Sequence, residues 1–129
     1  MSLQENFESN RCCVIMPTYN NGQSLAQVLN SILNYTDHII IIDDGSTDAT
    51  PEILSNYPNL EIIQFNKNKG KGYALRKAFT RAGEMGYSHA ISMDSDGQHF
   101  ADDLPVFMDA LEKNPDTLFV GAQIGRAHV

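Results

Sequence analysis

The sequence predicts an α/β protein in which a mostly parallel β-sheet is covered by helices on both faces. Short apolar runs alternate about four times with longer segments of helical period along the 129 residues, which is typical of β-α units joined by right-handed crossovers. The first two apolar runs have no polar face, as expected for strands buried on both sides. Polar residues follow the strands, at the edge of a parallel sheet where ligands bind.

Length and composition indicate one globular domain or a piece of one. A chain of 129 residues can bury one core but not two, and 42% hydrophobic and 19% charged residues are usual for a soluble protein. The net charge of −7 argues against a nucleic-acid-binding surface. Six of the nine Lys and Arg residues nevertheless fall within one short segment that could meet phosphate: Lys67, Lys69, Lys71, Arg76, Lys77 and Arg81.

Cysteine usage and hydropathy indicate a cytoplasmic protein. Cys12 and Cys13 are adjacent in an apolar run without a third partner, so buried reduced thiols are expected rather than a disulfide framework or a zinc site. No leading segment resembles a signal peptide, and no apolar run approaches the length of a membrane span. Residues 1–10 are mostly polar and are predicted to be a flexible lead-in to a domain over residues 11–129.

The first β-α unit is predicted over residues 12–33. Cys12 to Met16 is apolar on both faces and is ended by Pro17, which suits a central parallel strand. The helix that follows is expected to be capped near Asn21 or Gly22. Its apolar stripe has members three and four positions apart: Leu25, Val28, Leu29, Ile32 and Leu33.

Two further strands are predicted downstream. His38 to Ile42 is apolar throughout and is closed by two aspartates. A turn then leads to a short helix that Asp48 or Thr50 can cap and that has a proline in its first turn. Leu60 to Phe65 has mixed faces, so this third strand is expected nearer an edge of the sheet.

The second half of the chain repeats the pattern. A polar, lysine-rich loop leads into a helix over Tyr73 to Ala82 that ends at nearby glycines. Ala90 to Met93 is the fourth strand. A helix over residues 102–114 follows it, and Thr117 to Val120 begin a fifth strand.

A pair of aspartates ends the fourth strand. In an extended segment Asp94 and Asp96 point the same way, and their charges repel each other at roughly the kcal/mol level in a partly wet site. A divalent cation relieves this repulsion, because Mg²⁺ and Mn²⁺ prefer carboxylate oxygens. Gln98 offers a further oxygen from the same side, and His99 could orient a ligand. The alternative interpretation is a solvated acidic turn.

The loops after the other strands should share this edge. Tyr19 can lay its ring under a nucleobase or ribose, or merely cover the sheet end, while Thr18 and Asn20 offer hydrogen bonds. Asp43 and Asp44 suit base N–H groups or ribose hydroxyls, and one of them is expected only to cap the turn.

The lysine-rich loop, residues 66–72, brings positive charge to the same edge. Lys71 is the cation expected to point inward, and the others are expected on a solvated helix face. The loop has neither the Gly-Lys-Ser/Thr order of a Walker A motif nor the third glycine of a dinucleotide fingerprint. No Ser, His and Asp arrangement supports acyl transfer.

Four stretches, in one order along residues 11–121, resemble family 2 glycosyltransferases of the GT-A fold: V-I-M-P-T-Y-N-N, I-I-I-I-D-D-G-S-T-D, N-K-G-K-G-Y-A-L-R and M-D-S-D-G-Q-H. The polyprenyl- and dolichyl-phosphate mannosyl- or glucosyltransferase branch is the most similar. The resemblance implies a Rossmann-like, mostly parallel sheet that binds a UDP- or GDP-sugar. Because family members continue beyond this length, the chain is expected to be the donor-binding portion, truncated before the acceptor site and the catalytic base.

The resemblance also implies roles for individual residues. Pro17, Tyr19 and Asp44 fall on positions that hold the nucleotide, and Ile42 on a backbone contact to the base. Asp94 and Asp96 fall on the DxD motif, which binds the diphosphate through Mn²⁺ or Mg²⁺, and Gln98 on an additional metal ligand. The predicted nucleotide-sugar-binding set is completed by Thr18, Asn21, Asp43, Lys71 and Ser95.

The implied reaction is an inverting sugar transfer to a polyprenyl phosphate, a glycan or another acceptor, at the cytoplasmic face of a membrane. The metal and a nearby cation would neutralise the departing nucleoside diphosphate. The sequence departs from the dolichyl-phosphate branch at Asn21, where Glu is frequent, and at Gln123, where Arg is expected and Arg126 is out of register. A truncated domain leaves apolar surface exposed, so self-association is a further expectation.

Two other classes of function compete with this interpretation. A haloacid-dehalogenase-like phosphohydrolase also has an apolar strand followed by D-x-D-G, and its first Asp attacks phosphorus. That family has Thr or Val in place of Gln98 and usually opens the chain with this loop. The other alternative is a non-catalytic nucleotide-binding module.

Overall fold

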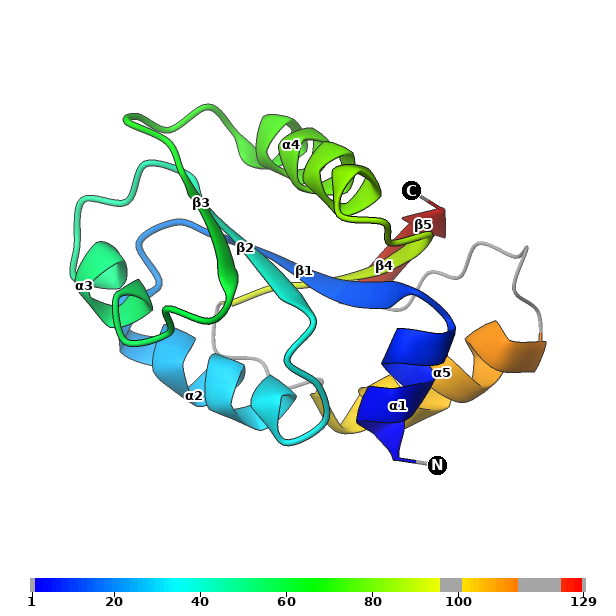
Figure 1. Ribbon diagram of the computed structural model, residues 1–129. Helices are drawn as coiled ribbons and strands as arrows, with labels where there is room; N and C mark the ends of the chain where they lie inside the picture. Colours follow the sequence, from blue (N-terminus) through cyan, green and yellow to red (C-terminus); the bar gives the residue numbers. More distant parts are fainter. Residues whose placement is uncertain (1, 96–100, 114–123, 129) are drawn as a thin grey trace.

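A computed structural model describes residues 2–95, 101–113 and 124–128 and contains one five-stranded sheet (Figure 1). The strands stand in the spatial order β3-β2-β1-β4-β5. The first four are parallel, and β5 is antiparallel to β4. In chain order they are β1 (Cys12–Thr18), β2 (Ile39–Asp43), β3 (Glu61–Gln64), β4 (His89–Met93) and β5 (Ile124–His128).

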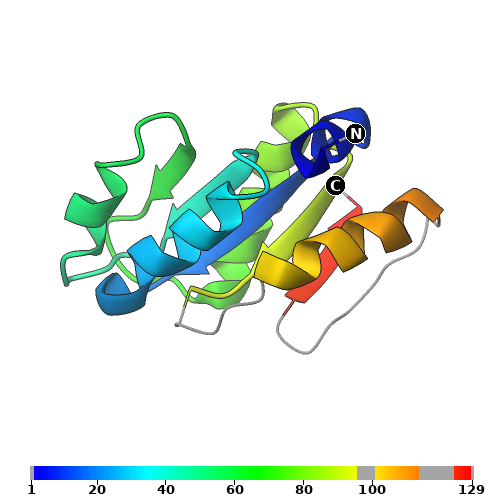
Figure 2. The same ribbon diagram turned by 90° about the horizontal axis from the view of Figure 1, so that it is seen from below.

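Helices cover both faces of the sheet, as Figures 1 and 2 show. The helix α4 (Lys71–Glu84) packs on one face. The opposite face carries α1 (Leu3–Ser9), α2 (Gly22–Leu33), α3 (Thr50–Leu54), the 3₁₀ turn η1 (Ala101–Asp103) and α5 (Leu104–Lys113). This arrangement confirms the predicted fold class. Among the described residues, no helix is long and apolar enough to cross a bilayer.

The strands β1 and β2 form the centre of the sheet because neither has a polar face. Every residue of both strands is buried. Their side chains belong to two apolar clusters, one on each face of the sheet. The strand β3 is largely half-buried and lies at the edge, as its mixed faces predicted. Strand order reverses between β1 and β4, so the loops that follow these two strands diverge and leave room for a ligand.

The helices α2 and α4 are fixed to the sheet in different ways. The predicted apolar stripe of α2 is confirmed, since its buried residues are Leu25, Val28, Leu29 and Ile32. The buried residues of α4 are instead small and recur every four positions, which lets the helix approach β1 and β2 closely: Ala74, Ala78 and Ala82. The lysine-rich loop is therefore held above the ends of β1 and β2.

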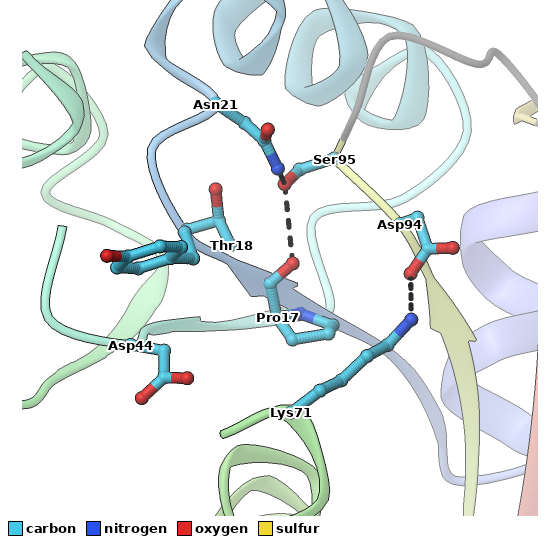
Figure 3. Close-up of a pocket in the computed structure, with 8 residues that line it drawn as sticks. Pro17, Thr18, Asn21, Asp44, Lys71, Asp94 and Ser95 are labelled. Carbon is cyan, nitrogen blue, oxygen red and sulfur yellow. Dashed lines mark hydrogen bonds and ion pairs between the residues drawn. The ribbon is translucent and has the colours of Figure 1, made fainter. Parts of the chain in front are cut away.

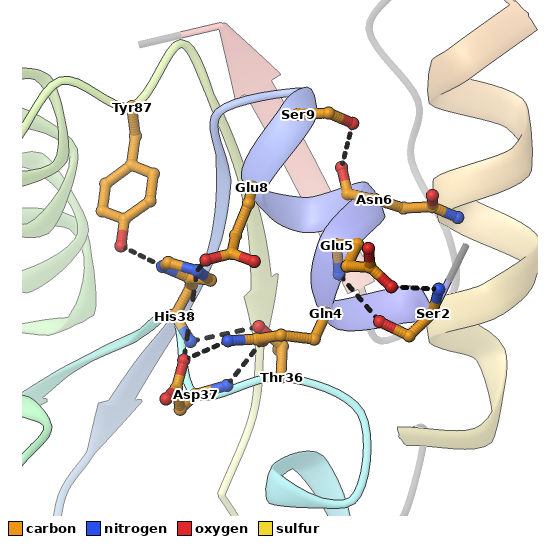
Figure 4. Close-up of polar contacts among 10 residues, drawn as sticks. All are labelled: Ser2, Gln4, Glu5, Asn6, Glu8, Ser9, Thr36, Asp37, His38 and Tyr87. Carbon is orange, nitrogen blue, oxygen red and sulfur yellow. Dashed lines mark hydrogen bonds and ion pairs between the residues drawn. The ribbon is translucent and has the colours of Figure 1, made fainter.

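The prediction of a flexible lead-in over residues 1–10 is corrected by α1 (Figure 4). Ser2 and Glu5 form a capping box: the Ser2 hydroxyl accepts from the Glu5 amide at 3.1 Å, and the Glu5 carboxylate accepts from the Ser2 amide at 3.0 Å. Phe7 is fully buried among the core residues. The Gln4 side chain of α1 forms two hydrogen bonds with Asp37 in the loop before β2. One apolar anchor among polar residues is too little periodicity to predict a helix.

The fifth strand of the sheet runs antiparallel to its neighbour, which agrees with the prediction of a mostly parallel sheet. Thr117 to Val120, where that strand was expected to begin, lie outside the described residues. The described strand is β5, which pairs antiparallel with β4 from His89↔His128 to Met93↔Ile124. An apolar run carries no information on strand direction, and antiparallel edge strands are common on otherwise parallel sheets.

Candidate functional site

A pocket of about 220 Å³ opens at the carboxyl edge of β1 and β4, where strand order reverses (Figure 3). Eight residues line it, and all belong to the predicted nucleotide-sugar-binding set: Pro17, Thr18, Tyr19, Asn21, Asp44, Lys71, Asp94 and Ser95. Ile42 and Asp43 are buried outside the lining. Asp96 lies outside the described residues.

The end of β1 supplies the apolar floor and one aromatic ring. Pro17 and Thr18 pair with Ile42 and Asp43 in the parallel ladder. Thr18 is 2% exposed, and within the described part of the chain its hydroxyl has no hydrogen-bond partner. Tyr19 is 45% exposed at the pocket, so its ring is accessible to a ligand instead of buried over the sheet end.

Asn20, predicted to offer hydrogen bonds to a ligand, binds a neighbouring loop instead. Its side-chain oxygen accepts from the backbone amides of Thr47 and Asp48 at 2.8 and 3.3 Å. Its backbone amide donates to the Ser46 hydroxyl at 2.9 Å. The residue has φ of +52°, a left-handed conformation in which Asn is enriched. Asn20 therefore ties the loop after β1 to the loop after β2.

Asp48 joins two helix beginnings beside the pocket. Its carboxylate accepts from the Thr50 amide at 2.9 Å and from the Gly22 amide at 2.9 Å. Hydrogen bonds from Thr50, and then from Gly22, lower the pKa of the Asp48 carboxyl below its ordinary value of 3.8. Asp48 or Thr50 was predicted to cap the short helix; the cap position is Ala49, which makes no side-chain capping bond, and Asp48 instead binds the amide of the first helical residue, Thr50. The contact with Gly22, across 26 positions, was not predicted.

The two aspartates after β2 have different partners. Asp43 accepts from the Ser46 amide at 3.0 Å and so is the one that caps the turn. Asp44 accepts from the Lys69 amide at 2.7 Å, the Gly70 amide at 3.0 Å and the Asn68 side chain at 3.1 Å. Such charge-assisted bonds are strong. Asp44 therefore fixes the lysine-rich loop while still lining the pocket.

Gly45 lets that loop approach. Its φ is +75°, and a Cβ atom added there would lie 2.3 Å from the carbonyl carbon of Lys67 and 2.4 Å from the amide nitrogen of Asn68. Only glycine fits against backbone at this distance. Asp44 and Gly45 together thus form the surface on which the loop before α4 packs. Spacing along the sequence does not reveal this role.

Lys71 and Asp94 face each other across the pocket (Figure 3). The Lys71 ammonium lies 2.7 Å from a carboxylate oxygen of Asp94, and the two side chains are 61% and 25% exposed. The prediction that Lys71 points inward is confirmed by its place in the lining. The pair joins the first residue of α4 to the end of β4.

Ser95 holds the end of β4 against the start of α2. Its hydroxyl accepts from the Asn21 side chain at 2.9 Å and donates to the Pro17 carbonyl at 3.3 Å. Its carbonyl accepts from the Ser24 hydroxyl at 2.6 Å. Ser24 was absent from the sequence prediction, although a serine in the first turn of a helix after a polar loop is the kind of residue that makes such contacts.

The described residues contribute one part of the predicted metal site. Among residues 2–95, 101–113 and 124–128, no three His, Cys, Asp or Glu side chains gather as a metal-binding group. Asp96, Gln98 and His99 lie outside that part of the chain. Asp94 has a carboxylate oxygen 2.7 Å from a positive charge, so its position at the pocket suits a cation.

Residues 13–128 match the family model described as Glycosyl transferase family 2. The chain is 30% identical over 128 residues to the UDP-N-acetylglucosamine–dolichyl-phosphate N-acetylglucosaminyltransferase of Methanococcus voltae, covering 86% of this chain and 51% of that protein. It is 29% identical to the polyprenol monophosphomannose synthase of Mycolicibacterium smegmatis, covering 88% of this chain and 45% of that protein. The chain spans about half the length of the curated relatives it matches.

Solved structures share the fold. TarS of S. aureus aligns with a TM-score of 0.69 and 25% identity over 83% of this chain and 34% of that one. Glucosyl-3-phosphoglycerate synthase of Mycobacterium tuberculosis, crystallised with Mn²⁺, UDP and phosphoglyceric acid, aligns with a TM-score of 0.69 and 22% identity over 90% of this chain and 44% of that one. These likenesses confirm the GT-A fold.

Proposed function

Because this chain belongs to glycosyltransferase family 2, we propose that its pocket binds the nucleotide of a UDP- or GDP-sugar and that the whole protein transfers the sugar with inversion. The observation that carries the proposal is the lining itself. One exposed aromatic ring, one lysine and two carboxylates surround about 220 Å³ at the switch point of the sheet, where α/β proteins of this kind bind nucleotides. The family match favours this function over a phosphohydrolase.

The base and ribose are assigned to the β1 side of the pocket. The exposed ring of Tyr19 offers a stacking surface. The Thr18 hydroxyl is buried without a partner among the described residues, and a buried polar group of this kind is stabilised when a ligand supplies the missing hydrogen bond. Asp44 has three of its acceptor positions filled by the lysine-rich loop, and the remaining one suits a base N–H group.

The diphosphate is assigned to the β4 side. Lys71 is mostly exposed and bonded only at its tip to Asp94, so it can turn toward a phosphate oxygen. Asp94, with Asp96 and Gln98, would hold Mn²⁺ or Mg²⁺, and the carboxylate and amide oxygens of this set are ligands that both ions accept. When bound, such a metal neutralises charge on the departing diphosphate. The related structure crystallised with Mn²⁺ and UDP supports this assignment.

The acceptor is proposed to be a lipid phosphate at the cytoplasmic membrane face, because two of the relatives are named for dolichyl phosphate and for polyprenol. Within the described residues, both carboxylates of the pocket have partners: Asp44 binds the lysine-rich loop, and Asp94 pairs with Lys71. Neither is assigned as the base that deprotonates an acceptor. We therefore expect this chain to bind a nucleoside diphosphate more readily than it transfers sugar.

Calorimetry tests the proposal. UDP or GDP with Mn²⁺ should bind the 129-residue chain, and Asp94→Asn should weaken binding in the presence of the metal. Hydrolysis of a chromogenic phosphate ester, abolished in Asp94→Asn, would support the phosphohydrolase instead. If neither nucleotide binds with or without metal, the donor-pocket assignment is wrong.

A further inference from the structure

Three cations, two on α4 and one in the loop before it, surround one aromatic ring of the helix. The ammonium nitrogens of Lys69 and Lys77 lie 5.2 and 5.5 Å from the centre of the Tyr73 ring, and the guanidinium carbon of Arg76 lies 5.9 Å from it. Phe65 packs edge-on against the same ring, with centroids 5.4 Å apart. Lys69, Tyr73, Arg76 and Lys77 are called the basic cluster below.

Within the described part of the chain, no carboxylate forms an ion pair with the basic cluster. The ion pairs of α4 use other residues: Lys71 pairs with Asp94, and Arg81 pairs with two glutamates. The attraction between a ring and each cation is weak at an exposed site. It does not account for three neighbouring positive charges in a chain whose net charge is −7. An anionic partner does.

Part of the basic cluster surrounds a hollow on α4, the helix whose first residue lines the donor pocket. Tyr73, Arg76, Lys77 and Thr80 line a second pocket of about 260 Å³, which has room for a phosphate-bearing head group. Lys71, the first residue of α4, lines the donor pocket. At about 1.5 Å of rise per residue, Lys77 lies only about 9 Å further along the helix axis. The six residues from Lys71 to Lys77 also turn the helix by about 600°, so the basic cluster and the donor pocket lie on different sides of α4 and share no lining residue.

We propose that the basic cluster docks the protein on the phosphate head groups of an anionic membrane. The inference rests on the proposed function, in which the acceptor is a lipid phosphate, and names the surface that meets the bilayer. Lys and Arg side chains are attracted to anionic lipids, and an amphipathic Tyr ring suits the head-group level. A nucleic acid matches less well, because surfaces that follow a strand present several stacking rings and this cluster has one.

Vesicle co-sedimentation without nucleotide tests the docking surface. The 129-residue chain should bind vesicles of phosphatidylcholine mixed with phosphatidylglycerol, should not bind phosphatidylcholine alone, and should be released by salt. Each Lys or Arg near an anionic surface strengthens binding by about fivefold. The triple variant Lys69→Gln, Arg76→Gln, Lys77→Gln should therefore bind about 100-fold more weakly.

A matched variant controls for net charge. Gln23→Glu, Gln27→Glu and Lys113→Gln change the net charge by the same three units, at exposed positions on the helices of the opposite face. This control should bind vesicles as the wild type does. Equal weakening in both variants, or none in the cluster variant, would overturn the docking surface. Single-stranded RNA is tested in the same way. If the wild type binds RNA as tightly as it binds vesicles, and the cluster variant no longer binds RNA, the basic cluster is a nucleic-acid-binding surface.

Calorimetry on the same cluster variant separates the two proposals. UDP or GDP should bind it as it binds the wild type, because none of the three changed side chains lines the donor pocket. A variant that keeps nucleotide binding while vesicle binding is unaffected would overturn the docking surface alone. Failure of the wild type to bind either nucleotide would overturn the donor pocket. The vesicle experiment would then still decide whether the basic cluster binds an anionic membrane.

Discussion

Polar residues at the carboxyl edge of the sheet form two groups with different partners. The framework group binds backbone atoms of neighbouring loops and consists of Asn20, Asp43, Asp44, Asp48 and Ser95. The pocket-facing group is at least partly exposed and consists of Tyr19, Lys71 and Asp94. The ion pair between Lys71 and Asp94 joins two members of this group to each other. Chemical type does not separate the groups, since both contain aspartates.

The difference shows how the fold prepares a site. Backbone amides of the loops after β2 and β3 would cost free energy if they were left unsatisfied, and framework side chains satisfy them inside the protein. Side chains of the pocket-facing group have no such obligation and remain able to bind a ligand. We therefore expect framework substitutions to lower both stability and nucleotide affinity, and pocket-facing substitutions to lower affinity alone.

The largest expected effect comes from Asp44→Ala. It removes the acceptor of the Lys69 and Gly70 amides and of the Asn68 side chain. The free energy of unfolding in urea should fall by about 3–5 kcal/mol, and nucleotide binding should be lost. Asp44→Asn keeps one acceptor oxygen and should be less severe. An Asp44→Ala variant of wild-type stability would show that the framework group has been assigned wrongly.

Gly45→Ala should be next in size. The new Cβ atom would meet the backbone of Lys67 and Asn68 in addition to the cost of positive φ. Gly86→Ala is the matched control, because Gly86 has φ of +92° and no atom within 4 Å of the position a Cβ would take. We expect thermal or urea unfolding to show Gly45→Ala at least about 1–2 kcal/mol less stable than the control. Equal losses of stability in the two variants would mean that the lysine-rich loop does not pack against Gly45.

Tyr19→Ala should separate the two groups most clearly. Loss of the stacking surface should weaken UDP or GDP binding by about 10-fold or more, while the free energy of unfolding changes by less than about 0.5 kcal/mol because the ring is exposed. Calorimetry and urea unfolding measure the two quantities. Tyr19→Phe keeps the ring and should bind as the wild type does. A loss of stability matching that of Asp44→Ala would place Tyr19 in the framework group.

The smallest expected effect is a pH dependence from Asp48. Its pKa is lowered in the folded state from the ordinary value of 3.8, so the folded protein binds fewer protons at this site than the unfolded chain. The resulting stability is present above pH 3.8 and is lost as the pH falls through the lower, folded-state pKa. Acid titration of the wild type against Asp48→Asn should show the steeper loss in the wild type. Parallel curves would rule out this linkage.

Much of this architecture could be predicted because the relevant signals are local. Apolar runs identify β1 and β2, and the period of α2 identifies its buried stripe. Residues that follow parallel strands must meet at one edge, and the resemblance to family 2 glycosyltransferases selected individual residues there; the eight lining residues all belong to that predicted set.

The rest depends on partners far apart in the sequence. Asp44 binds amides 25 and 26 positions away, and nothing in its own neighbourhood separates it from Asp43. Asn20 was predicted to donate hydrogen bonds to a ligand. The sequence around it carries no sign that its side chain binds another loop. The helix anchored by Phe7 was missed for the same reason, and the sequence carried no signal for the direction of β5. Asp96 and Gln98 remain predictions from the motif, outside the described residues.

A crystal of this chain soaked with UDP or GDP and Mn²⁺ tests the central claim most directly. We predict a nucleotide in the pocket between β1 and β4, with its base on Tyr19, its diphosphate at Asp94, and the Lys71 ammonium moved from Asp94 toward a phosphate oxygen. A nucleotide bound elsewhere on the chain, with Tyr19, Lys71 and Asp94 left as they are here, would contradict the account.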